Sequence, residues 1–359
     1  MRGYLRGVRA LTVDPKQPDS LRVSELPDPQ PAAGDLLVEG LAVGVCGTDK
    51  EIVRAEYGWS PPDRQRLVLG HESLGRVRTA PPGSGFSPGD LVVGVVRRPD
   101  PVPCGACAHG EFDMCRNGRY TERGIKQRDG YGSQLWCVEI DYAVTLDPRL
   151  AHVGVLVEPT TVVVKAWEQV WRVGERGWFE PRRALVTGAG PIGLLAALVG
   201  LRRGLDVHVL DRVTSGPKPA LVQALGATYH HDSVDSVAER VRPDVVVEAT
   251  GAASVVFDAI ASTPPYGIVC LTGVSPAGRT LSVDAGGINR GLVLENDVVI
   301  GSVNANLRHY RQAAQVLAES DVDWLGGLIS RRVPLDRFAD AFTAQPDDVK
   351  VVITLDGSG

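Results

Sequence analysis

The sequence of 359 residues contains no uninterrupted apolar run long enough to span a bilayer. Residues 1–6 lack the apolar core of a secretory signal peptide. A basic excess is also missing, because the net charge is −5 and the isoelectric point is about 5.8. These values argue against a nucleic-acid or membrane-surface role. We therefore expect a cytoplasmic protein that binds neither nucleic acid nor a membrane.

Cysteine is scarce, with six residues in the chain. In a reducing cytoplasm, such thiols are metal ligands or core residues more often than disulfides. Internal repeats and low-complexity tracts are absent as well. Hydrophobic residues make up 43% and charged residues 23% of the chain, so ordinary hydrophobic cores can form. The length favours two domains.

One stretch organises the chain: the apolar run at residues 184–187 enters a glycine-rich turn and leaves as an Ala/Leu-rich run at residues 194–200. Gly188, Gly190 and Gly193 match the spacing of the dinucleotide-binding fingerprint. The first glycine permits the tight turn, the second lets a pyrophosphate approach the backbone, and the third lets helix and strand pack closely. A glycine turn without a nucleotide is the alternative, but the flanking strand and helix favour the fingerprint.

A second apolar run, residues 207–210, ends in Asp211, at the distance where a ribose-binding acid is expected. Asp211 favours NAD, because a carboxylate binds both ribose hydroxyls and repels the 2′-phosphate of NADP. Arg212 is the contrary signal, since it can pair with that phosphate. We therefore expect a preference for NAD, with use of both cofactors open.

The pattern of elements changes along the chain. Residues 36–43, 89–93 and 135–138 predict short strands, and residues 67–75 predict a strand that ends in a turn with two metal-capable side chains. Residues 160–173 predict a linking helix. Near-continuous apolar strands between helices follow, including residues 244–250, 268–272 and 298–300, and a final strand is expected at residues 349–355. Such runs indicate a doubly wound parallel sheet. We expect a β-rich domain in residues 1–160, a nucleotide-binding domain in residues 161–305, and a return to the first domain in residues 306–359.

Cys46, His71 and Glu72 are residue types that zinc selects. Each also has an ordinary interpretation, because a cysteine beside a strand is commonly a small core residue. Likewise, a histidine after an apolar run is commonly a hydrogen-bonded core residue. Composition alone leaves the two interpretations balanced.

Residues 44–49 and 70–72, Gly-Val-Cys-Gly-Thr-Asp and Gly-His-Glu, resemble the catalytic-zinc motifs of the medium-chain dehydrogenase/reductase superfamily. Four further segments resemble the zinc-dependent glucose dehydrogenase family within it: residues 120–125, 156–159, 283–286 and 301–304. The resemblance extends over nearly the whole chain. It implies an α/β protein in which a GroES-like β-rich catalytic domain accompanies a Rossmann domain.

The resemblance implies a catalytic zinc on Cys46 and His71, with Glu72 and Glu158 as oxygen ligands, bound directly or through water. Three protein ligands and an open position are what Lewis-acid chemistry requires. The alternative for Glu158 is a surface acid before a proline.

By the same resemblance, Thr48 passes the substrate proton towards solvent and Asp49 orients His71. Thr48, Glu122, Glu158 and His309 contact the substrate. The alternative for Glu122 is a salt bridge with Arg123 or Lys126, and for His309 a solvent-facing position on a helix. The implied cofactor contacts, besides the three glycines, Asp211 and Arg212, are Pro191, Ile192, Thr250, Thr272, Gly273, Ser302, Val303 and Asn304.

Cys104, Cys107 and Cys115 resemble three quarters of the superfamily's structural zinc site, but the first position of that pattern is Pro101, which cannot bind a metal. Structural zinc requires four ligands. The fourth is therefore one of three nearby residues, or the lobe holds no metal; those residues are Asp100, His109 and Glu111.

The implied reaction is hydride transfer from the C1 hydroxyl of an aldose of the glucose type to NAD(P), giving a lactone. The alternative is a dehydrogenase of another polyol, a cyclitol or an amino sugar in secondary metabolism. A zinc-free reductase of the same superfamily is a third possibility, and the Cys46, His71 and Glu72 set argues against it. The resemblance also implies a homodimer or homotetramer, which in this family is usually joined through edge strands of the nucleotide-binding sheet.

Overall fold

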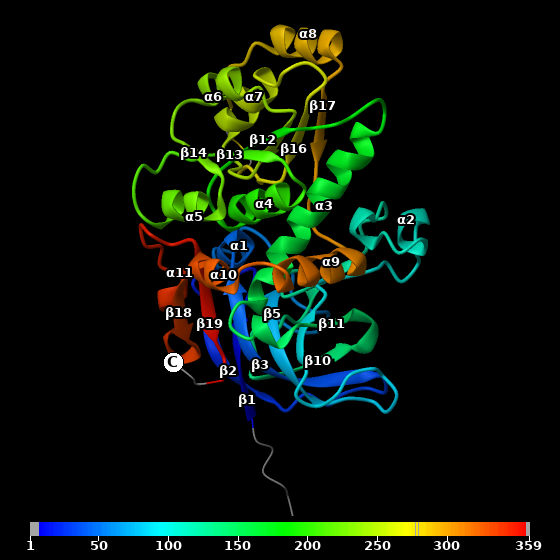
Figure 1. The fold of residues 1–359 in the computed structure, drawn as a ribbon. Helices are drawn as coiled ribbons and strands as arrows, with labels where there is room; N and C mark the ends of the chain where they lie inside the picture. Colours follow the sequence, from blue (N-terminus) through cyan, green and yellow to red (C-terminus); the bar gives the residue numbers. More distant parts are fainter. Residues whose placement is uncertain (1–6, 277, 279, 357–359) are drawn as a thin grey trace, which may run out of the picture. The chain divides into compact units, whose positions relative to one another are not determined.

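The computed structural model describes residues 7–276, 278 and 280–356 (Figure 1). The chain divides into two compact units, Met1–Glu158 with Ala305–Gly359, and Pro159–Asn304. Residues 1–6, on which the expectation about a signal peptide rests, lie outside the described residues. Within the described part of the chain, no helix is both long and apolar enough to cross a membrane.

The first unit is rich in β-structure (Figure 1). A three-stranded sheet has the order β2-β1-β4, and the largest sheet has the order β11-β6-β5-β3-β19-β18, with β10 also paired to β3. These strands are β1 (Gly7–Val13), β2 (Arg22–Pro27), β3 (Asp35–Val45), β4 (Leu67–Val68), β5 (Glu72–Thr79), β6 (Leu91–Gly94), β10 (Leu135–Glu139), β11 (Ala143–Thr145), β18 (Ile329–Pro334) and β19 (Lys350–Thr354).

A small third sheet and short helices complete this unit. The sheet has the order β7-β8-β9. The remaining elements are β7 (Arg97–Arg98), β8 (Thr121–Arg123), β9 (Gln127–Arg128), α1 (Gly47–Val53), α2 (Gly105–Ala108), η1 (Phe112–Met114), η2 (Ile140–Tyr142), η3 (Pro148–Leu150), η4 (Gly154–Leu156), α9 (Leu307–Ala318), α10 (Val322–Leu328), η5 (Leu335–Arg337) and α11 (Phe338–Phe342).

Strand β3 is the centre of the first unit. It alternates buried and partly exposed side chains along its first half, which is the period of a half-buried strand, and Leu36 and Val38 pack into a core with Val77 and Trp136. At its end, β3 pairs antiparallel with β5 on one side and with β19 on the other. Three segments far apart in the sequence therefore meet at the end of β3.

The turn expected within residues 67–75 is present, but a second strand follows it, because the chain bends in the middle of this stretch. Strand β4 ends at Val68 and β5 begins at Glu72. Gly70 between them has a φ of +95°, a conformation that glycine adopts without the strain of a Cβ. A Cβ on Gly70 would also lie 2.6 Å from a methyl group of Val43. The bend turns His71 out of the strand direction.

The second unit is a parallel sheet with the order β14-β13-β12-β15-β16-β17 (Figure 1). Every pair in it is parallel, and the order is that of the doubly wound dinucleotide-binding fold. The strands are β12 (Arg183–Thr187), β13 (Asp206–Leu210), β14 (Thr228–His230), β15 (Val245–Glu248), β16 (Ile268–Leu271) and β17 (Val298–Gly301). The helices are α4 (Pro191–Arg202), α5 (Pro217–Leu225), α6 (Val234–Val241), α7 (Ala253–Ala261) and α8 (Ala285–Glu295). The first boundary between the units, after Glu158, falls within α3 (Val157–Gly174).

Helix α4 shows why the local sequence folds this way. Pro191 occupies its first turn, where the missing N–H costs nothing, and Gly190 is the N-cap. The helix is apolar on all sides and buried from Gly193 to Gly200, as expected for a helix covered by its own sheet. The predicted fold class, a β-rich unit with a doubly wound parallel sheet, is confirmed.

Candidate active site

Cys46 and His71 approach each other at the end of β3. Cys46 follows β3 as the N-cap of α1, and His71 follows the bend at Gly70. The Cys46 Sγ lies 3.1 Å from the His71 Nε2. A thiol and an imidazole from segments 25 residues apart in the sequence thus point at one place in the fold.

Asp49 supports both side chains from α1. One carboxylate oxygen accepts the backbone N–H of Cys46 at 2.9 Å, and the other lies 3.4 Å from the Nδ1 of His71. The carboxylate thus lies on the Nδ1 side of the ring, and Nε2 faces Cys46; an acid behind the ring is common for metal-binding histidines. Burial alone would raise the pKa of Asp49, but the His71 imidazole and the Cys46 N–H lower it.

Glu72 is held by a lysine that the sequence analysis missed. The Nζ of Lys350 lies 2.6 and 2.7 Å from the two carboxylate oxygens of Glu72, and both side chains are at most 3% exposed. Lys350 begins β19, and Val351 pairs with Val45 in β3. Burial lowers the pKa of Lys350, but its contact with Glu72 outweighs this effect and raises it. Only the non-local pairing of β19 with β3 brings this cation to the site.

Gly44 makes room for that carboxylate. It stands opposite Glu72 in the β3–β5 register, and a Cβ at Gly44 would lie 1.9 Å from a carboxylate oxygen of Glu72. No side chain fits there without displacing the acid. The glycine of the Gly-Val-Cys motif is therefore a packing requirement of the site.

Glu72 and Glu158 bring two further carboxylates to His71. A carboxylate oxygen of Glu158, an imidazole nitrogen of His71 and a carboxylate oxygen of Glu72 lie within 4.8 Å of one another. Burial raises the pKa of Glu158 to about 7. Glu158 lies in the first turn of α3.

This donor set fits zinc. It contains a thiol, an imidazole and carboxylates, and His71 belongs to two groups of candidate ligands, one with Cys46 and Asp49 and one with Glu72 and Glu158. Burial raises the pKa of the Cys46 thiol, with partial opposition from His71. A divalent cation would reverse that effect, because a coordinated thiol is deprotonated. Cys46, His71 and the carboxylates are thus suited to hold the ion.

The other predicted substrate residues have these surroundings. Thr48 is partly exposed at the start of α1, two residues after Cys46. Glu122 is buried, and its carboxylate pairs with Arg97 at 2.9 Å, a partner that the sequence analysis did not consider. The solvent-facing alternative for His309 is wrong, because the residue is fully buried and its Nδ1 accepts the N–H of Asn306 at the start of α9.

In the second unit, the three glycines of the fingerprint have different surroundings. Gly188 has a φ of +95°, which the tight turn requires. A Cβ on Gly193 would lie 1.7 Å from the carbonyl oxygen of Gly188, so helix and turn pack closely there. A Cβ on Gly190 would meet nothing within 4 Å. The open space lies at the N-terminus of α4, where backbone N–H groups suit a phosphate.

Asp211 lies against this turn at the end of β13. Its carboxylate accepts the N–H of Ala189 at 2.7 Å. The Nζ of Lys218, near the start of α5, lies 3.4 Å from the same oxygen, whereas Arg212 is exposed. The acid beside the fingerprint thus has a basic neighbour that sequence spacing did not reveal.

Glu248 is a second residue that the sequence analysis missed. It is fully buried at the end of β15, and its carboxylate accepts the N–H groups of Thr250 and Gly251 and contacts the Thr250 hydroxyl. The Thr272 hydroxyl donates to its backbone carbonyl at 2.7 Å. An acid that ends an apolar strand is the signal that could have found it. Glu248 fixes the turns that carry Thr250, Thr272 and Gly273.

Ser302, Val303 and Asn304 follow β17. Ser302 is buried, Val303 is 60% exposed, and Asn304 has a φ of +60°. The carbonyl oxygen of Val303 accepts a hydrogen bond from the Nζ of Lys165, a buried side chain of α3, at 2.9 Å. Pro191 and Ile192 open α4. The contacts of these residues with the cofactor stay predictions.

The chain matches two family models. "Alcohol dehydrogenase GroES-like domain" matches residues 32–148, and "Glucose dehydrogenase C-terminus" matches residues 151–355.

Relatives match over nearly the full length. A glucose 1-dehydrogenase of Methanocella arvoryzae is 40% identical over 357 residues, covering 97% of this chain and 99% of the relative. One from Thermoproteus tenax is also 40% identical, over 355 residues, covering 96% and 99%. The structure of Haloferax mediterranei glucose dehydrogenase in complex with NADP, Zn and gluconolactone matches with a TM-score of 0.88 at 32% identity, covering 96% of this chain and 99% of that one.

A GroES-like unit with a zinc-type donor set and a Rossmann unit with a dinucleotide turn define a zinc-dependent medium-chain dehydrogenase. Within that class, the chain belongs to the glucose dehydrogenase family. The resemblance stated from the sequence motifs is confirmed.

Replacing Lys350 by methionine should destabilise the first unit. It leaves Glu72 buried without its cation, so the free energy of unfolding of the metal-free protein should fall by about 3–5 kcal/mol. Adding Glu72→Gln should restore at least half of the loss, because the buried charge is gone. Denaturant titration measures both values, with Lys16→Met on the surface as control. Equal losses in the single and double variants would contradict the role given to the pair.

Alanine at Gly190 and at Gly193 should have opposite consequences. Gly190→Ala should leave the melting temperature unchanged but raise the KM for the nicotinamide cofactor at least about tenfold, since the Cβ occupies the open space at α4. Gly193→Ala should lower the melting temperature, because its Cβ collides with the turn. Calorimetry and initial-rate kinetics test this. Unchanged cofactor kinetics in Gly190→Ala would refute the phosphate position.

Proposed function

We propose that the protein oxidises the C1 hydroxyl of an aldose of the glucose type to a lactone, with zinc and a nicotinamide dinucleotide as cofactors. The observation that carries the proposal is the approach of the Cys46 thiol to His71, together with the Glu72 and Glu158 carboxylates near the same imidazole, in a chain of the glucose dehydrogenase family. The Methanocella and Thermoproteus relatives are glucose 1-dehydrogenases, and the Haloferax structure holds gluconolactone.

The proposed roles follow from where the side chains lie. Cys46 and His71 would hold zinc with Glu72 or Glu158, and the ion would supply Lewis-acid chemistry that favours deprotonation of the substrate hydroxyl. The nicotinamide supplies the hydride acceptor, and the chain positions the reactants. Thr48, at the start of α1 and partly open to solvent, relays the hydroxyl proton outward. Asp49 keeps the His71 ring in orientation.

The substrate pocket is proposed to include Glu122 and His309. Both side chains are buried and held in place, Glu122 by Arg97 and His309 by the N-cap of α9. Fixed polar groups of this kind distinguish sugars through their hydroxyls.

A cytoplasmic location is also part of the proposal.

For the cofactor we propose NAD in preference to NADP. Asp211 beside the glycine turn supports it, because its charge repels a 2′-phosphate. Lys218, 3.4 Å from Asp211, and Arg212 favour the opposite choice. The Haloferax enzyme binds NADP. Use of both cofactors is therefore part of the proposal.

We also propose a homodimer or homotetramer built on β17. This strand is an edge of the sheet among the described residues, and the neighbouring α8 buries none of its side chains. Val293 and Leu294 of α8 are more than 60% exposed. A second copy of the chain at this edge would pair with β17 and cover these side chains.

Analytical ultracentrifugation tests the oligomeric state and should find no monomer at micromolar concentration.

The activity itself is tested with purified protein, glucose and either nicotinamide cofactor. Cys46→Ser and His71→Ala should each lower kcat/KM at least about a hundredfold, a loss of ~2.7 kcal/mol in transition-state stabilisation. Cys137→Ser, a free thiol in β10, is the matched control and should not change the rate. Full activity in both zinc-site variants, or turnover of no aldose, would reject the proposed function.

The cofactor preference is tested by Asp211→Asn. This change removes the charge but keeps an acceptor for the Ala189 N–H. The ratio of kcat/KM for NADP to that for NAD should rise about tenfold, ~1.4 kcal/mol. Adding Lys218→Gln should reverse part of the gain. An unchanged ratio in Asp211→Asn means that Asp211 does not select the cofactor.

A further inference from the structure

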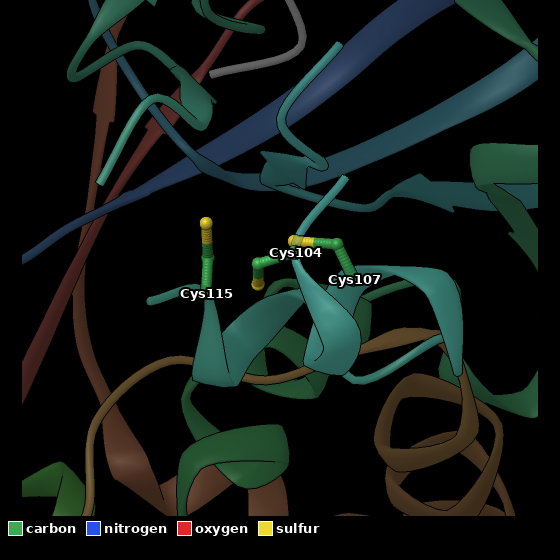
Figure 2. Close-up of side chains that lie close together, drawn as sticks. All are labelled: Cys104, Cys107 and Cys115. Carbon is green, nitrogen blue, oxygen red and sulfur yellow. The ribbon is translucent and has the colours of Figure 1, made fainter. Parts of the chain in front are cut away.

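Three thiols meet in the lobe of residues 99–119, in the first unit. Cys104 is the N-cap of α2, Cys107 lies within α2, and Cys115 follows η1. Their sulfur atoms lie within 4.8 Å of one another. Figure 2 shows the three side chains close together. The backbone N–H of Arg116 donates to the Cys104 sulfur at 3.4 Å, as N–H groups do towards thiolates that hold a metal.

The residues expected to complete a zinc sphere do not join the thiols. Among the described residues, the cluster contains no fourth histidine, cysteine or acid. His109 is exposed, and its Nδ1 contacts the carbonyl of Gly105 at 2.7 Å. Glu111 pairs with Arg308. Asp100 lies next to Pro101, but its carboxylate is bound to other groups of the lobe. A four-ligand structural zinc therefore does not fit these residues.

Asp100 links the two ends of the lobe by hydrogen bonds, as a fourth metal ligand would link them through the metal. It is 3% exposed and accepts the N–H of Val102 at 2.8 Å, the side-chain amide of Asn117 at 2.9 Å and the Arg119 guanidinium at 3.2 Å. Residues 17 and 19 positions further along are thus tied to Asp100 across the lobe. The loop that contains the three cysteines is closed by polar contacts without any metal.

We propose that the lobe is an open three-thiolate site for a soft, thiophilic cation, with water in the fourth position. The three sulfurs supply the soft donors that such ions select, and the missing fourth ligand leaves one coordination position to solvent. Binding releases the thiol protons to the buffer and involves no change of oxidation state. Because Asp100 holds the lobe, the ion exchanges without unfolding it.

Cadmium binding to the metal-free, reduced full-length protein tests this. Each Cd–thiolate bond contributes ultraviolet charge-transfer absorption, and the two sites together offer about four thiolates, three in the lobe and Cys46. Serine at Cys104, Cys107 and Cys115 together should remove about three quarters of the absorption, and Cys46→Ser about one quarter. Cys137→Ser is the matched control and should leave it unchanged. An unchanged absorption in the triple variant overturns the proposal.

Stability separates an open site from a closed structural one. Removal of the lobe ion by a chelator in the Cys46→Ser background should shift the melting temperature less than Asp100→Ala does, since Asp100 binds three partners. The single variant Cys115→Ser serves if the triple variant does not fold, and should lower the cadmium absorption and raise the rate of chelation. Unfolding of the lobe on removal of the ion, or a Cys104–Cys107 disulfide in reducing buffer, would contradict the proposal.

Discussion

The candidate active site depends on the buried ion pair between Lys350 and Glu72. The lysine begins the last strand and the glutamate begins β5, and β3 lies between them with Gly44 leaving room for the carboxylate. Two charges removed from water are tolerated only when each satisfies the other. The pair therefore ties the C-terminal strand to the metal-binding segment, and the completed sheet is a condition for a correctly placed Glu72.

Other acidic side chains position the remaining groups of the two units. Asp49 accepts the Cys46 N–H and lies 3.4 Å from the Nδ1 of His71, and Glu158 approaches His71 from the start of α3. In the second unit, Glu248 has the corresponding role for the turns that follow β15 and β16. In each unit a buried acid accepts backbone N–H groups of a turn that follows a strand: Asp49 in α1 accepts that of Cys46, and Glu248 accepts those of Thr250 and Gly251.

Local sequence patterns predicted the second unit well, because parallel strands and their helices are signalled by short-range periodicity and by the glycine turn. The motifs around Cys46 and His71 indicated zinc through resemblance. Lys350 escaped prediction, since nothing around it indicates that β19 pairs with β3. The burial of His309 also depends on tertiary packing rather than on neighbours in sequence. Asp100 was considered as a ligand, whereas the structure places it in a hydrogen-bond network.

The most direct test of the account is X-ray absorption at the zinc edge, measured on a variant without the three lobe cysteines. We predict about one zinc per chain with a single sulfur donor and two or three nitrogen or oxygen donors, which matches Cys46, His71 and the carboxylates. The sulfur donor should disappear in the same variant with Cys46→Ser. A zinc bound only by nitrogen and oxygen before that change, or no bound zinc in an active enzyme, would contradict the account.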